Sequence, residues 1–140
     1  MKLTREQAIA EHRKMWLWIS RQIMKDYVKY GKVETIYQYK VDYSNMYCEG
    51  EIIRSKCFCC EYVAQTDGMC MFKCPLWWND KNTIRTCCED EGYYEILNNI
   101  VKDAVYSLFH SISEHDAKRA ARMAYKIAML DEKESKEKCI

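Results

Sequence analysis

Proline and glycine are scarce in this chain, with one proline and four glycines among 140 residues. Tight hairpin turns depend on these two residues, which supply the backbone angles that such turns need. Their scarcity argues against a turn-rich β-sandwich and leaves little material for linkers between domains. We therefore expect long helices in a single domain over residues 1–140, since this length is typical of one domain.

Long apolar runs are also missing from the chain. No stretch approaches the roughly 18 apolar residues that a membrane-spanning helix requires. The N-terminal segment MKLTREQAIAEHRK carries charges throughout and lacks the apolar core of a secretory signal. These two features predict a cytoplasmic protein with no membrane partner.

The chain also lacks an excess of charge of either sign, because it has 22 Lys and Arg residues and 21 Asp and Glu residues. Binding to nucleic-acid phosphates needs clustered positive charge, so the overall balance does not indicate it. Two local basic groups keep a nucleic-acid surface open, although charge runs usually form a solvated helix face. They are Lys25, Lys29 and Lys32, and Lys118, Arg119 and Arg122.

Known catalytic patterns are missing too. The chain has no H-E-x-x-H, no G-x-S-x-G, no glycine-rich phosphate loop and no H-x-E followed by P-C-x-x-C. His12 falls in an apolar helical stripe, where we expect a hydrogen-bonded core histidine and not a metal ligand. His110 and His115 would point about 140° apart on one helix, so we do not expect a zinc pair. The sequence therefore predicts a protein that is not an enzyme.

The first predicted element is a helix over residues 5–29. Thr4 and Gln7 have the spacing of a capping box, in which each side chain bonds a backbone N–H of the other residue. Gly31 is a natural stop, because glycine enters the left-handed conformation of a helix end at low cost. A stripe at helical spacing connects these ends, formed by Ile9, His12, Trp16, Ile19, Ile23 and Tyr27.

Residues 93–130 predict two further helices, followed by a charged tail. The first helix has apolar residues at helical spacing to about residue 112, and Ser113 is a suitable N-cap for the second. Small residues on the second helix would permit close approach of another helix. They belong to the stripe Ala117, Ala120, Ala121, Ala124, Ile127 and Ala128. The tail, residues 131–140, is expected to fray.

Residues 33–56 fit two kinds of structure. Ile36, Tyr39 and Tyr43 would share one face of a helix. Apolar residues also occur at every second position, as they do in a strand. The alternating residues are Tyr37, Tyr39, Val41 and Tyr43. We favour short, irregular structure over residues 33–56 and leave a short β-hairpin open.

Cysteines concentrate in one region, since seven of the nine lie between residues 57 and 88. They are Cys57, Cys59, Cys60, Cys70, Cys74, Cys87 and Cys88. Residues 57–92 include few aliphatic side chains, so this region needs cross-links or a metal ion to become ordered. The odd cysteine count and the expected reducing compartment argue against disulfides. The spacings match neither ferredoxin pattern, and no βαβ unit precedes them as in thioredoxin-like redox sites.

The spacing Cys57-x2-Cys60 is typical of a zinc knuckle, in which one tight turn presents two thiolates. The second pair is either Cys70-x3-Cys74 or Cys74 with Cys87 or Cys88. Tetrahedral zinc takes four such ligands, and the free energy of binding would order the loop. We therefore expect zinc as the cofactor.

The expected fold class is mainly α. About three long helices would pack around the face that carries Trp16 and Ile19. The cysteine-rich zinc-binding loop, residues 57–92, would be inserted between the first helix and the C-terminal helices.

Four segments together resemble a group of small, mostly uncharacterised proteins of bacteriophages and prophages in Firmicutes and gut bacteria. The segments are HRKMWLWIS (12–20), CFCCEY (57–62), CPLWW (74–78) and ARMAYKIAML (121–130). In that group a helix with an HRxxWxWI-like stretch precedes C-x-x-C-E-Y and C-x-x-C-P-L-x-W segments, a further cysteine and an alanine-rich helix. The resemblance does not extend to residues 33–56 or to most of residues 89–112.

The resemblance implies metal thiols at Cys57, Cys60, Cys74 and Cys87. Another cysteine of that group corresponds to Cys70, although three residues separate it from Cys74 here, where the group has two. The resemblance further implies a phage accessory protein that works inside an infected bacterium, and it implies no known reaction.

Three functional hypotheses follow from these features. The first is a non-enzymatic, zinc-stabilised helical module that binds a host or phage macromolecule. Its sharper form is an inhibitor of a bacterial defence system such as a CRISPR effector. The alternative is a nucleic-acid-binding zinc protein of phage transcription or DNA metabolism. An enzyme with an open zinc position comes third, and four cysteine ligands would exclude it by closing the site.

Overall fold

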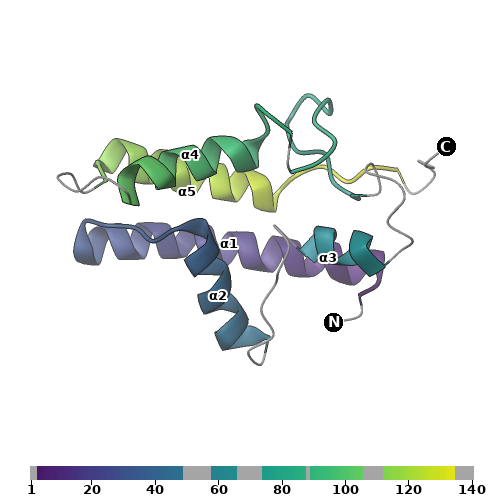
Figure 1. Cartoon of the computed structure of the whole chain (residues 1–140), viewed down its shortest axis with the longest axis horizontal. Helices are drawn as coiled ribbons and strands as arrows, with labels where there is room; N and C mark the ends of the chain where they lie inside the picture. The colour runs from purple at the N-terminus through teal and green to yellow at the C-terminus, as the bar shows by residue number, and fades with distance from the viewer. Residues whose placement is uncertain (1–2, 49–57, 66–73, 88, 106–111, 135–140) are drawn as a thin grey trace.

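A computed structural model describes residues 3–48, 58–65, 74–87, 89–105 and 112–134. These residues form five helices (Figure 1): α1 (Arg5–Tyr30), α2 (Ile36–Tyr47), α3 (Phe58–Gln65), α4 (Tyr93–Val105) and α5 (Glu114–Ala128). The fold is mainly α, as predicted. The only β pairing in the described part is an isolated bridge between Leu76 and Glu132, so no hairpin is found there.

Helix α1 begins and ends at the residues that the sequence marks. The Thr4 side chain accepts a hydrogen bond from the Gln7 backbone N–H at 3.1 Å, and the Gln7 side chain accepts one from the Thr4 N–H at 2.9 Å. Gly31 ends the helix in the left-handed conformation, with φ 66°. The capping-box prediction is therefore confirmed, because both reciprocal bonds form.

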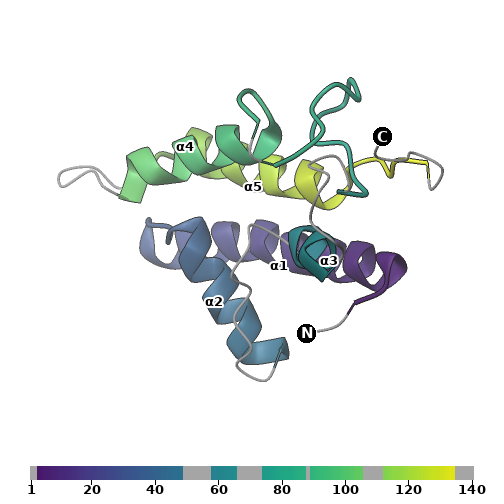
Figure 2. The same ribbon diagram turned by 45° about the vertical axis from the view of Figure 1, so that its right-hand side comes forward.

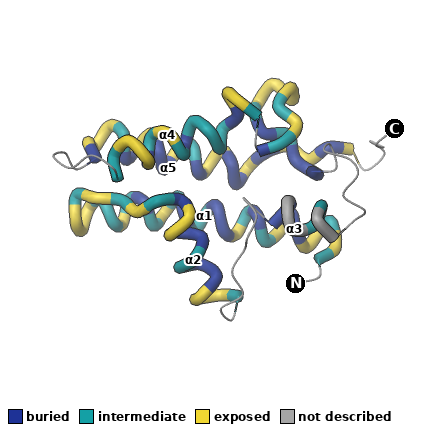
Figure 3. Tube along the Cα trace, viewed as in Figure 1, coloured by how far each residue is buried: buried dark blue, intermediate teal, exposed yellow. Residues whose placement is uncertain are grey.

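Helix α5 packs along α1, α4 packs on α5, and α2 and α3 both contact α1. Figures 1 and 2 show two layers, with α4 and α5 in one layer and α1 and α3 in the other. The residues buried on α1 and α5 lie on the sides where these two helices face each other (Figure 3). The core of the described residues thus lies between the two layers.

The alanine stripe of α5 allows close contact with α1. All five alanines of the predicted stripe are buried, and small side chains let two helix backbones approach. Ser20 donates to the Ala121 carbonyl at 2.7 Å, and Arg13 donates to the Ala128 carbonyl at 2.8 Å. Bonds between a side chain of one helix and the backbone of the other require this proximity.

Ser113 caps α5 by accepting from the Asp116 N–H at 3.1 Å, as its predicted role requires.

Helix α2 replaces the irregular structure favoured for residues 33–56, and that preference is wrong for residues 36–47. Thr35 caps the helix, since its hydroxyl accepts the Gln38 N–H at 3.1 Å. Ile36, Tyr39 and Tyr43 are buried on one side, so the helical spacing prevails over the alternation of tyrosines. The two views show α2 projecting away from both layers (Figures 1 and 2).

Two other segments differ from the predicted architecture. Helix α3 lies inside the region expected to be a loop, so α2 and α3 add to the expected set of about three long helices. In the tail, the Lys133 N–H donates to the Pro75 carbonyl at 2.7 Å, and the Trp77 N–H donates to the Asp131 carbonyl at 3.0 Å. This part of the tail is therefore attached and does not fray. Residues 106–111 and 135–140 lie outside the described residues.

Candidate functional site

The structure describes only some of the predicted zinc ligands. Cys57 and Cys70 lie outside the described residues, as does Cys88. Cys60 lies in the first turn of α3, and its side chain is not part of the description. Cys74 and Cys87 are both described and are 5% and 2% exposed. The expected zinc set is thus untested as a set, and two of its members are buried.

Cys59 is the cysteine that the structure adds to this region. It lies in the first turn of α3, is fully buried, and its thiol is hydrogen-bonded to that of Cys74. Spacing drew attention to Cys57 and Cys60 and missed Cys59. The sequence pattern that could have identified Cys59 is the apolar face of α3. Cys59 precedes Tyr62 and Val63 by three and four residues, which places the three on one helix face, and Tyr62 and Val63 are partly buried.

The surroundings of Cys74 favour the protonated form of its thiol. The hydrogen bond with Cys59 raises the pKa of the Cys74 thiol well above its usual range, and burial raises it further. The indole Nε1–H of Trp78 donates to Cys74 Sγ at 3.4 Å and acts in the opposite direction on this pKa. A hydrogen bond with the Leu76 backbone acts in the same direction, so a thiolate at Cys74 would have two donors in place.

His12 lies next to this pair. Its Nε2 is 2.7 Å from the Ile127 carbonyl oxygen, and since a carbonyl can only accept, Nε2 carries the proton. Burial lowers the pKa of His12, and the neighbouring Cys59 opposes that shift. The expectation of a hydrogen-bonded core histidine is confirmed. The second ring nitrogen, Nδ1, is buried and has no hydrogen-bond partner among the described residues.

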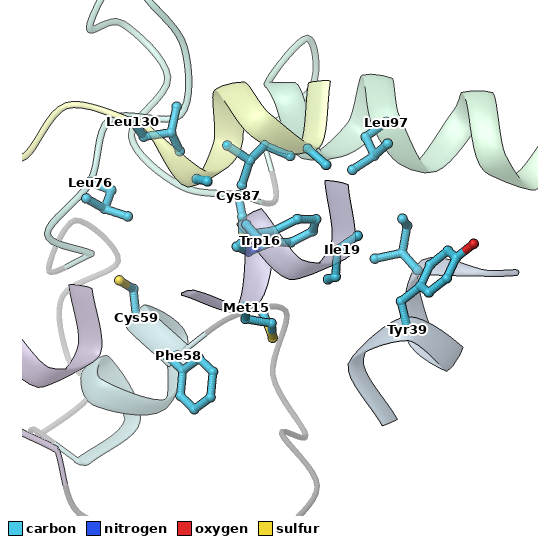
Figure 4. Close-up of a cluster of buried hydrophobic side chains, with 14 of the residues drawn as sticks. Met15, Trp16, Ile19, Tyr39, Phe58, Cys59, Leu76, Cys87, Leu97 and Leu130 are labelled. Carbon is cyan, nitrogen blue, oxygen red and sulfur yellow. The ribbon is translucent and has the colours of Figure 1, made fainter. Parts of the chain in front are cut away.

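Trp78 connects the histidine with the thiols. Its ring lies 5.6 Å from the His12 ring, centroid to centroid, in an edge-on arrangement at 87°. We call the four residues His12, Cys59, Cys74 and Trp78 the thiol corner. Figure 4 shows Cys59 beside Phe58 and Leu76, whereas Cys87 lies nearer Trp16. Helices α1 and α3 and the segment from Cys74 to Trp78 therefore meet at the thiol corner.

The donor chemistry of the thiol corner suits a thiophilic metal ion such as zinc, because two sulfurs are soft ligands. In the residues described, however, no three His, Cys, Asp or Glu side chains are arranged to hold an ion. The two thiols supply half of a tetrahedral set. Cys48, Cys59, Cys74 and Cys87 are not joined to one another by disulfides.

The other predicted features of the surface are exposed. His115 lies on the outer face of α5, while His110 falls outside the described part of the chain. Lys118 pairs with Glu114 at 2.8 Å on α5, as is usual for a solvated helix face. Over the described ranges, no helix has the length and apolar content needed to cross a membrane.

Comparison with known protein families, curated proteins and solved structures finds no match to this chain. Function must therefore be argued from its own residues.

Proposed function

We propose that the chain is a non-enzymatic, zinc-stabilised helical module that binds a host or phage protein in the cytoplasm of an infected bacterium. The observation that carries the binding role is a concentration of exposed apolar side chains. Seven large apolar residues of the described chain are strongly exposed, and five of them lie between residues 28 and 47. These five, 59% to 77% exposed, are Val28, Tyr30, Tyr37, Met46 and Tyr47.

The position of these residues supports a contact surface. They lie at the end of α1 and on α2, the helix that projects from the two layers (Figure 2). Single exposed apolar residues are ordinary, but tyrosine and methionine are enriched where proteins contact each other. We call residues 28–47 the α2 arm and assign partner binding to it.

Zinc binding is supported by the chemistry of Cys59 and Cys74, with Cys57, Cys60, Cys70 and Cys87 as candidates for the other positions. A zinc ion held there would join α3 to the segment that begins at Cys74. Both described thiols are buried, so an ion bound by them would be shielded from a substrate. Shielding suits a structural site, because a catalytic zinc keeps an open position.

Elemental analysis tests the zinc part of the proposal. Protein purified under reducing conditions without added metal should contain about one zinc per chain, and titration of free thiols should find fewer reactive cysteines before chelation than after it. Protein that is folded, free of metal and fully thiol-reactive would contradict this part.

Site-specific photocrosslinking tests the binding part. A benzoylphenylalanine placed at Tyr37 or Tyr47 should form a discrete protein adduct in phage-infected cells. The matched control carries the same probe at Lys102, an exposed position of α4. Identical adducts from Lys102, or none from the α2 arm, would contradict the assignment.

The inhibitor form of the proposal has its own assay. Expression of the chain should restore plaques of a sensitive phage on a strain defended by a CRISPR effector or another defence system. Tyr47→Glu should abolish this rescue, because a charged side chain would oppose an apolar contact. Failure of the unchanged chain on every defended strain would remove this form only.

Nucleic-acid binding remains the second candidate, and one observation favours it. Arg21, Lys25 and Lys29 are exposed and follow each other at four-residue intervals along α1, so they share one face. A gel shift at low salt, where phosphate contacts are strongest, should then detect binding that Lys25→Glu weakens. Absence of any shift with DNA and RNA would exclude this candidate.

A further inference from the structure

The side chain of His12 poses a physical problem. It is fully buried, and its Nδ1 atom has no hydrogen-bond partner among the described residues. Leaving a buried polar atom unpaired is unfavourable, and such atoms in native proteins call for a specific explanation. An apolar residue at this position would avoid the cost, so the imidazole needs a reason to be there.

The ring is held as a metal ligand would be held. The Nε2–H donates to the Ile127 carbonyl at 2.7 Å, which fixes both the ring orientation and the tautomer. The lone pair is therefore on Nδ1. Histidines that bind metal ions commonly donate their other ring N–H to a backbone carbonyl in this way.

The neighbours of His12 include two soft donors. Cys59 lies close enough to affect the imidazole electrostatically, and its thiol is hydrogen-bonded to that of Cys74. Trp78 contacts both sides of this group, since its ring lies against that of His12 and its Nε1–H donates to Cys74 Sγ at 3.4 Å. The thiol corner therefore brings one nitrogen and two sulfur donors into a single buried neighbourhood.

We infer that His12 Nδ1, Cys59 Sγ and Cys74 Sγ are three ligands of the metal site, which takes a thiophilic divalent cation of the zinc class. This inference rests on the proposed zinc binding and changes its ligand set, because Cys59 takes the place that spacing gives to Cys57 or Cys60. Binding releases one proton from each thiol and forms two sulfur–metal bonds and one nitrogen–metal bond, with no oxidation or reduction. No three donors of the described residues surround an ion position in this structure. Loss of the thiol protons would remove the Cys59–Cys74 hydrogen bond, and both sulfurs would then have to turn toward the ion.

Cobalt(II) titration of the full chain under reducing conditions tests this ligand set. The unchanged protein should develop thiolate-to-cobalt charge-transfer bands and the intense visible bands of a tetrahedral site. His12→Gln and Cys59→Ser should each weaken cobalt binding by at least about tenfold, the lower end of losses seen when even outer residues of metal sites change. Cys48→Ser, which alters the partly buried cysteine that ends α2, is the matched control and should bind as the unchanged protein does.

A second measurement avoids substitutions, which matters if His12→Gln fails to fold as judged by circular dichroism. Protein labelled with ¹⁵N-histidine and loaded with ¹¹³Cd should show scalar coupling between cadmium and Nδ1 of His12. Cobalt binding that persists in folded His12→Gln and Cys59→Ser, or cadmium without coupling to His12, would overturn the inference and leave zinc binding in place. Absence of any metal binding by the folded, unchanged chain would overturn both.

Discussion

Along the α1–α5 interface, contacts are made by alanines and by side chains that donate to backbone carbonyls, whereas the thiol corner relies on sulfur, an indole N–H and a buried imidazole. The first region bonds the Ser20 hydroxyl to the Ala121 carbonyl, but it leaves the buried Trp16 Nε1 of α1 without a hydrogen-bond partner among the described residues. The second leaves His12 Nδ1 without a described partner. The two regions therefore differ in the kind of group that is unpaired: on α1 it is an indole N–H, which can only donate, and at the thiol corner it is an imidazole nitrogen that carries a lone pair.

Removing the largest fully buried side chain of α1 gives the largest effect we expect. Trp16 is fully buried, and its ring lies 6.0 Å from that of Tyr94. Trp16→Ala should lower the free energy of unfolding by about 3–5 kcal/mol, because it removes apolar burial and leaves a cavity. Chemical denaturation with and without a chelator measures this loss. A loss that appears only with metal present would mean that the helix interface depends on the thiol corner.

Overfilling the helix interface should have the next largest effect. Ala124 is fully buried between α5 and α1, so Ala124→Leu should destabilise the protein by about 1–3 kcal/mol through displaced packing. Ala10→Leu is the control, since Ala10 is exposed on α1 and changes there usually stay within about 0.5 kcal/mol. Thermal unfolding compares the two variants. Equal stability would show that the alanine stripe does not set the helix separation.

Changing the indole donor examines the thiol corner alone. Trp78→Phe removes the N–H that donates to Cys74 Sγ, so it should cost at least about 1 kcal/mol and raise the pKa of Cys74 further. The pH dependence of the Cys74 ¹³Cβ chemical shift reports that pKa. Trp77→Phe is the control, because the Trp77 ring lies 4.8 Å from Lys133 Nζ and is partly buried. A pKa of Cys74 that is the same in both variants would contradict the role given to Trp78.

The same contrast explains what the sequence could predict. Caps and the alanine stripe depend on residues within one or two helical turns, so Thr4, Gly31 and Ser113 identify helix ends correctly. The contact of Cys59 with Cys74 joins residues fifteen positions apart through tertiary packing, and spacing rules for zinc knuckles do not detect it. Helix α2 was not predicted for a local reason, because tyrosines at alternate positions fit a strand as well as a helix. Only the burial of Tyr39 and Tyr43 in the core decides between the two.

The smallest effect is expected at the junction of α1 and α2, where the stability of the protein should depend on pH. Burial raises the pKa of Glu34 to about 7, helped by a hydrogen bond with Asp42 and by the charges of Asp42 and Asp26. The value in the folded protein lies above the ordinary 4.5, so the folded state binds more protons between these two values. Stability should therefore decline as the pH rises from about 4.5 through 7.

Glu34→Gln removes the titrating carboxyl group and should make the decline of stability with rising pH less steep. At pH 8 the variant should be more stable than the unchanged chain by less than about 1 kcal/mol, because Glu34 is largely exposed and solvent screens its interactions. At pH 4 the two should be equal. Denaturation curves at both values measure the difference, with Glu134→Gln as an exposed control. If Glu34→Gln were neutral at pH 8, the carboxyl groups at this junction would not oppose folding, and the raised pKa of Glu34 would not contribute to the pH dependence of stability.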